Sequence, residues 1–362
     1  MLAVIAVHCN LMPSGWAGVW LFFVISGFIV TRSLISSHPY PSAINLLKNF
    51  SRQHWVRIFP VYFAYIVIGA LGLLILGYQI NPIAFFSLMG FFNNLALIFG
   101  VGDLNPWPSS HLWRISIEMQ FYLIYGCLFF LLPLRWTIRI LALFVLLAPL
   151  GRMGLSFGLA DLGVTTKQAA YAINLAPMVH FDSFSLGALL AFYGTKHSIS
   201  KIALPLSLLG LLAVALCGLV YASIHAHAQG FVDLSSIQNV FSGILASQFK
   251  EVFLYSALAV FFTGLIGLAT SRSVLTQWLL GNRHLQWLGN VSYGAYIYHA
   301  LCIKIAVIMI MGVSAEFSNA TLTDKMLVFG LTVLLNLAVA GLSFRYLETP
   351  INRYYHHKIY QY

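Results

Sequence analysis

The chain has 362 residues, of which Lys, Arg, Asp and Glu make up only 8% and hydrophobic residues 60%. Soluble domains carry about 25% charged residues, so this composition excludes a soluble fold, a disordered chain and a coiled coil. It predicts an all-α, polytopic membrane protein, because the apolar residues form long runs and do not alternate as in a β-barrel. The net charge of +10 does not indicate a nucleic-acid partner, since Lys and Arg collect in the cytoplasmic loops of membrane proteins.

Apolar runs follow one another along the whole chain, near residues 1–12, 16–36, 57–78, 83–100, 112–133, 137–154, 181–195, 202–223, 250–269, 288–312 and 325–346. A spanning helix needs about 20 residues, so we expect the first helix to be incomplete at its N-terminus. We expect the run at 83–100 not to cross, because a crossing there would place the loop with Arg135 and Arg139 outside. About ten spanning helices then remain, with cytoplasmic N and C termini and most of the 19 basic residues on the cytoplasmic side.

The organisation expected from this pattern is a single membrane domain over residues 1–362, with no soluble domain appended. The four cysteines, Cys9, Cys127, Cys217 and Cys302, do not form a CxxC pair. Neither a metal site nor a disulfide framework is therefore expected.

Polar side chains inside the membrane are costly, so each is a candidate for function. His8 lies in the first run, where it could be a functional group or could simply hydrogen-bond a neighbouring helix. The second run contains Gly18, Ser26 and Gly27, small residues that let helices approach closely.

The stretch from Phe50 to Phe63 reads FSRQHWVRIFPVYF and places Arg52 and Arg57 at the cytoplasmic mouth of the third run. Two interpretations stand side by side. These residues either anchor the helix at the cytoplasmic surface or bind phosphate groups, which guanidinium groups pair with bidentately.

The stretch from His111 to Leu123 reads HLWRISIEMQFYL, in which Arg114, Glu118 and Tyr122 share one helix face at i, i+4 and i+8. Glu118 either forms a structural ion pair, with Arg114 as the nearest candidate, or is a carboxylate that orients or charges a catalytic group.

The stretch from Leu288 to Ala300 reads LGNVSYGAYIYHA and carries Ser292, Tyr296 and His299 on one helix face, with Tyr293 beside it. Three polar groups on one face of a membrane helix indicate a polar cavity more readily than simple packing.

Together with FDSFSLGALLA (Phe181 to Ala191) and the YLETP ending, these segments resemble the acyltransferase 3 family of integral membrane acyltransferases over nearly the whole chain. The resemblance implies an O-acyltransferase of the bacterial inner membrane that moves an acyl group, usually acetyl from acetyl-CoA, onto a glycan hydroxyl. It implies that His8 is the catalytic or acyl-relaying group and that Arg52 and Arg57 bind the donor.

Further members of the predicted site come from the polar helix faces described above and from the FDSFSLGALLA segment. Glu118 is expected to assist His8, and the substrate or cavity residues are expected to be Trp113, Asp182, Ser292, Tyr293, Tyr296 and His299. The chain departs from the family pattern at Trp20, where an Asp is common, at Met119, where a second acid often follows the Glu, and at His180, where an Arg often stands.

Two other classes of protein fit the same composition. A transporter or flippase would also have about ten helices and buried polar groups, but it usually has internal repeats and broken helices at matching positions, which this sequence lacks. A non-catalytic partner of an envelope assembly machine would tolerate the loss of His8 and Arg57. For the acyltransferase interpretation, the expected partners are a glycan or lipid-linked saccharide acceptor and the lipid bilayer. The oligomeric state is left open.

Overall fold

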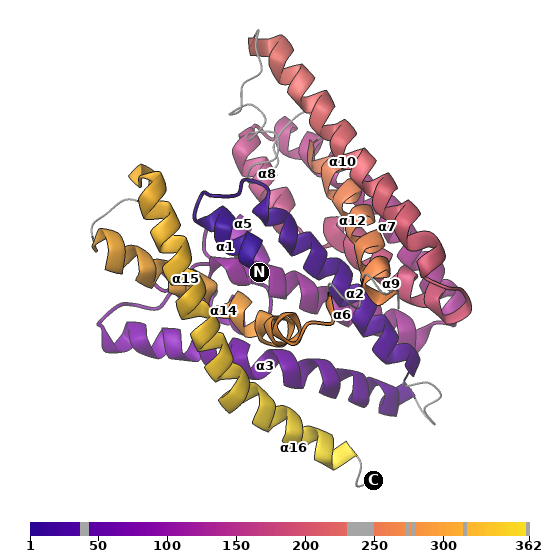
Figure 1. The fold of residues 1–362 in the computed structure, drawn as a ribbon, viewed down its shortest axis with the longest axis horizontal. Helices are drawn as coiled ribbons and strands as arrows, with labels where there is room; N and C mark the ends of the chain where they lie inside the picture. Colours follow the sequence, from indigo (N-terminus) through magenta and orange to yellow (C-terminus); the bar gives the residue numbers. More distant parts are fainter. Residues whose placement is uncertain (37–42, 230–249, 272–275, 277–279, 314–316, 360–362) are drawn as a thin grey trace. The chain divides into compact units, whose positions relative to one another are not determined.

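The computed structural model describes residues 1–362 except 37–42, 230–249, 272–275, 277–279, 314–316 and 360–362, and does not describe the side chains of 43–57, 228–229, 318 and 355–359. Its described residues form helices joined by turns, with no strand among them (Figure 1). Eight of these helices are long and apolar enough to cross a membrane. A ninth span is possible if Thr166–Leu175 and Met178–Lys196, which meet at 77°, form one broken crossing. The prediction of an all-α polytopic membrane protein is therefore confirmed.

The helices belong to two compact units, and the first comprises Met1–Gly15, Leu47–Ser116 and Gly281–Tyr362. Its helices are α1 (Leu2–His8), α3 (Ala43–Ile75), α4 (Pro82–Met89), α5 (Asn93–Ile98), η2 (Ser110–Leu112), α14 (Arg283–Met311), η4 (Phe317–Asn319), α15 (Leu322–Ser343), the π-helical η5 (Phe344–Glu348) and α16 (Thr349–Ile359).

Helix α1 is short, as the first apolar run led us to expect, but it is firmly placed within the first unit. Ile5 and Cys9 are fully buried and pack with Ala306 of α14 and Val328 of α15. Burying such side chains stabilises the contact by roughly 1.5–3 kcal/mol for each large residue. This packing fixes the end of α1, where His8 lies.

The run at 83–100 does not form a spanning helix but breaks into α4 and α5. Asn81 begins α4 by accepting the backbone N–H groups of Ile83 and Ala84. Phe91, between the two helices, has a φ of 59°, a left-handed conformation that interrupts the helix. The Asn93 amide, fully buried, donates to the carbonyl of Gly102 at 2.6 Å. The structure thus agrees with the expectation that this segment does not cross.

The second unit comprises Trp16–Leu46 and Ile117–Leu280. Its helices are α2 (Gly18–Ser36), α6 (Trp113–Leu131, from Ile117 on), α7 (Leu134–Asp161), α8 (Thr166–Leu175), η3 (Met178–His180), α9 (Phe181–Lys196), α10 (Ser200–Gln229) and α12 (Lys250–Thr270), and η1 (Gly15–Ala17) lies at its start. Helices α2 and α9 touch backbone to backbone at Gly27, because a Cβ there would overlap the carbonyl oxygen of Phe184. The predicted close approach at Gly27 is confirmed.

Candidate active site

Three histidines from distant parts of the sequence lie together in the first unit. His8 ends α1, His111 lies in η2, and His299 lies in the middle of α14. The ring centres of His8 and His299 are 5.3 Å apart, and those of His299 and His111 are 4.8 Å apart. His111 and His299 are buried, whereas His8 is exposed. The cluster therefore has an open end at His8 and a closed end behind it.

Backbone carbonyl groups hold the two buried rings. His111 Nε2 is 2.9 Å from the carbonyl oxygen of Ile297, and His299 Nδ1 is 2.6 Å from that of Tyr296. The Tyr296 hydroxyl donates in turn to the carbonyl oxygen of His111. The second nitrogen of each buried ring, Nδ1 of His111 and Nε2 of His299, has no hydrogen-bond partner among the described residues.

Aromatic and cationic groups surround this cluster. The guanidinium carbon of Arg114 lies 4.6 Å from the ring centre of Tyr296, a cation–π contact. Tyr65 of α3 packs its ring edge-to-face against His111 at 5.9 Å, and its hydroxyl donates to the carbonyl of Pro108 at 2.6 Å. The site therefore combines imidazole bases with fixed positive charge and aromatic walls.

Of the four α14 residues predicted to line the site, two lie in the histidine cluster and two make other contacts. Tyr296 and His299 join the histidine cluster, as the i, i+4, i+7 spacing indicated. Ser292 instead donates to the carbonyl of Gly289 in its own helix at 2.7 Å, and Tyr293 donates to the carbonyl of Ile58 in α3 at 2.9 Å. These two side chains thus make contacts away from the cluster.

The other residues predicted for this side of the site are placed less fully. Trp113 opens α6 and is half-buried. Arg52 and Arg57 fall in the part of α3 whose side chains lie outside the described residues, so the proposed phosphate contacts stay a prediction. His111 was not singled out from the sequence. The signal that could have found it is its position at the head of the HLWRISIEMQFYL stretch.

Glu118 lies in the second unit and is buried there. Its Oε1 accepts hydrogen bonds from the hydroxyl of Ser26 on α2 and from that of Tyr122 at 2.7 Å on its own helix. The i, i+4 contact with Tyr122 follows the predicted helix face. These two hydroxyl donors hold the carboxyl group of Glu118 between α2 and α6.

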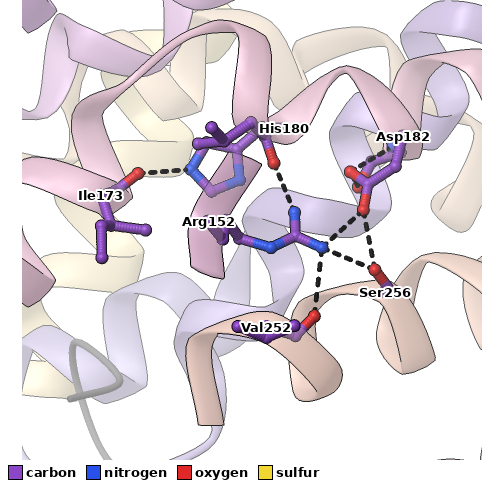
Figure 2. A network of polar contacts seen from close by, with 8 residues as sticks. Arg152, Ile173, His180, Asp182, Val252 and Ser256 are labelled. Atoms are coloured by element: carbon purple, nitrogen blue, oxygen red, sulfur yellow. Dashed lines mark hydrogen bonds and ion pairs between the residues drawn. The ribbon is translucent and has the colours of Figure 1, made fainter. Parts of the chain in front are cut away.

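A buried ion pair occupies the core of the second unit (Figure 2). Arg152 of α7 is 2.9 Å from Asp182 of α9, and the two side chains are 0% and 1% exposed. Arg152 also donates to Ser256 on α12 at 2.5 Å and to the carbonyl oxygens of Val252 and Val179. Asp182, predicted as a cavity residue, is therefore bound within a network that joins three helices.

Trp20 and His180, two of the departures from the family pattern, meet beside this network. Trp20 stacks on Tyr255 with ring centres 4.3 Å apart and planes within 9°, and it packs edge-to-face against His180 at 5.3 Å. Arg152 lies 5.7 Å from the Tyr255 ring centre. His180 Nε2 is 3.1 Å from the carbonyl of Ile173 (Figure 2). Within the described part of the chain, no group of three or more His, Cys, Asp or Glu side chains is arranged to hold a metal ion.

Three bacterial proteins match nearly the whole chain. Peptidoglycan O-acetyltransferase OatA of Listeria monocytogenes is 26% identical over 98% of this chain and 54% of its own length. O-acetyltransferase OatA of Staphylococcus aureus is 24% identical over 98% of the chain and 55% of its own length. Putative peptidoglycan O-acetyltransferase YrhL of Bacillus subtilis is 26% identical over 97% and 53%.

The chain thus spans about half the length of these curated relatives. No solved structure matches it. The family model described as an acyltransferase domain matches residues 1–345, almost the entire chain. The many apolar helices, the seven-segment resemblance and this match agree, and the chain belongs to the acyltransferase 3 family.

Proposed function

We propose that this protein is an O-acyltransferase of the bacterial inner membrane that moves an acyl group, most simply acetyl, from acyl-CoA to a hydroxyl of a cell-envelope glycan. Peptidoglycan is the acceptor class that we favour, because two of the relatives are a peptidoglycan O-acetyltransferase and a putative one. The observation that carries the proposal is the histidine cluster, in which an exposed imidazole lies at the open end of a site whose other rings are buried.

His8 is the residue that we assign to the chemistry. As a general base it takes the proton of the glycan hydroxyl while the oxygen attacks the acyl carbonyl carbon, and as an acid it returns the proton to the leaving thiolate. The same nitrogen could instead carry the acyl group transiently before the hydroxyl attacks. Glu118, accepting from Ser26 and Tyr122, is the proposed assisting carboxylate.

The test is transfer by the purified full chain in proteoliposomes. Labelled acetyl-CoA and soluble peptidoglycan fragments are supplied, and label in the fragments is measured. His8→Ala is expected to lower turnover by about 10²–10⁴-fold. His284→Ala, at an exposed histidine in the first turn of α14, is the matched control and should keep the rate. Full turnover by His8→Ala would refute the assignment of His8, and movement of substrate without an acylated product would favour a transporter.

The donor is tested separately through Arg52 and Arg57. If they bind the phosphates of CoA, Arg52→Ala and Arg57→Ala raise the KM for acetyl-CoA. The same variants should leave unchanged the rate with acetyl-N-acetylcysteamine, a thioester without phosphate groups. Equal losses with both donors would contradict a phosphate-binding role.

A further inference from the structure

The two buried histidines beside His8 have their hydrogen positions fixed by the backbone. A carbonyl oxygen only accepts, so the nitrogen that contacts it must carry the hydrogen. His299 therefore carries its hydrogen on Nδ1, 2.6 Å from the carbonyl oxygen of Tyr296. His111 carries its hydrogen on Nε2, 2.9 Å from that of Ile297. Both tautomers are thus assigned from the carbonyl oxygens that the ring nitrogens contact.

The remaining nitrogen of each neutral ring is then a lone pair. His299 Nε2 is fully buried and has no hydrogen-bond partner among the described residues. A buried acceptor left without a donor is destabilising, because it has lost its hydrogen bonds to water and gained none in the protein. A group that donates a hydrogen to this nitrogen is therefore expected in the working site.

The ring of His8 lies in contact with that of His299 and can supply this hydrogen. A hydrogen bond of about 2.9 Å between two imidazole nitrogens separates the ring centres by roughly 5 Å. The rings of His8 and His299 are 5.3 Å apart, with planes tilted by 36°. His8 is exposed and can turn, whereas His299 is backed by His111 in an edge-to-face contact at 4.8 Å.

We propose that His299 is a positioning residue for His8. Its Nε2 accepts a hydrogen bond from a ring N–H of His8. The proposal rests on the proposed function. It deepens that function by stating which form of His8 reacts. With one His8 nitrogen donating to His299, the other is left as the lone pair. A histidine partner fixes the tautomer here in the way that a carboxylate does in a Ser-His-Asp triad.

In the resulting reaction, one proton and one acyl group change place. The glycan hydroxyl gives its proton to the free nitrogen of His8, and its oxygen forms a bond with the acyl carbon. The carbon–sulfur bond of the thioester breaks, and the thiolate takes the proton back from His8. His299 Nε2 holds the second His8 hydrogen throughout and shares the positive charge while His8 carries both protons.

Two substitutions of His299 separate positioning from packing. His299→Asn can still donate to the Tyr296 carbonyl, because its amide nitrogen occupies nearly the place of Nδ1, but it has no acceptor at the place of Nε2. His299→Gln reaches the place of Nε2 and offers an amide oxygen there, but it loses the donor at Nδ1. A purely structural His299 therefore predicts that Asn is the better replacement, and a positioning His299 predicts that Gln is.

The variants are compared in the proteoliposome assay. We expect His299→Asn to lower kcat by about 10²-fold, within the range of acid–base catalysis, with the KM for the glycan fragment within about twofold of wild type. His299→Gln should recover at least about tenfold of that loss. Thermal melting of both variants in detergent shows whether each folds.

A second measurement needs no substrate. Diethyl pyrocarbonate acylates the lone-pair nitrogen of an imidazole, so the rate of His8 modification, followed by mass spectrometry, reports its reactivity. It should fall in His299→Asn and stay near wild type in His299→Gln. Equal His8 reactivity in both variants, or a better Asn variant in both assays, overturns this inference. If His8→Ala retains turnover, the proposed function fails instead, and the modification rates still test the contact between the two rings.

Discussion

Removing one member of the Arg152–Asp182 ion pair is expected to destabilise the second unit far more than its share of the loss in a variant that lacks both. The pair lies 2.9 Å apart with exposures of 0% and 1%, so water screens neither group. The perturbation is a double-mutant cycle of Arg152→Met, Asp182→Leu and the two together. Met is an unbranched apolar side chain close in volume to Arg, and Leu has the branched shape and the number of side-chain heavy atoms of Asp.

The magnitude follows from what each substitution leaves behind. Either single change strands one buried charge, which costs about 3–5 kcal/mol. Asp182→Leu should be the milder of the two, because Arg152 keeps the carbonyl oxygens of Val179 and Val252 as acceptors. The double change leaves those carbonyls without the guanidinium but leaves no charge stranded. We therefore expect it to be no worse than the more damaging single change, with a coupling energy of about 3 kcal/mol.

The assay is reversible unfolding in mixed micelles by titration with dodecyl sulfate, followed by circular dichroism. The free energy of unfolding is compared for wild type, the two single variants and the double variant. If the double variant loses the sum of the single losses to within about 0.5 kcal/mol, the two charges are not coupled and the reasoning is refuted.

Two further predictions concern α2 and α6. Gly27→Ala should lower the free energy of unfolding by about 1–3 kcal/mol, because the added Cβ would overlap the carbonyl oxygen of Phe184. Gly154→Ala, which has open space around its Cβ, is the control and should be neutral or stabilising. Equal melting temperatures of the two variants would contradict the backbone contact. Glu118→Gln keeps an acceptor for Tyr122 and should retain thermal stability while lowering kcat by about 10²-fold if the carboxylate takes part in catalysis. Unchanged turnover would show that the Glu118 carboxylate serves packing and not catalysis.

The spanning helices could be predicted from the sequence because each is set by a local property, the length of an apolar run. That residues 83–100 do not form a crossing was predicted from charge asymmetry alone. The structure adds a cause that the sequence hides, the left-handed backbone at Phe91, since a phenylalanine rarely adopts this conformation.

Sequence spacing located His299 and Tyr296, because i, i+4 and i+7 positions share a helix face. It did not single out Arg152, which is fully buried and paired with Asp182. It also passed over His111, whose partner Ile297 is 186 positions away. In both cases a contact between distant segments decides the role of the side chain, and no periodicity within one helix reports such a contact.

The departures at Trp20 and His180 are better understood as one exchange than as two. The rings touch at 5.3 Å, so the two positions share an environment. An acid and a base would bury two charges there, next to the Arg152–Asp182 pair. Instead, Trp20 offers a buried N–H, and His180, which donates through Nε2 to the carbonyl of Ile173, keeps a lone pair on Nδ1. Neither atom has a partner among the described residues, and one is a donor while the other is an acceptor. A neutral pair of matching polarity thus stands where the family pattern has two charged residues, and it carries a lower desolvation cost than two buried charges would.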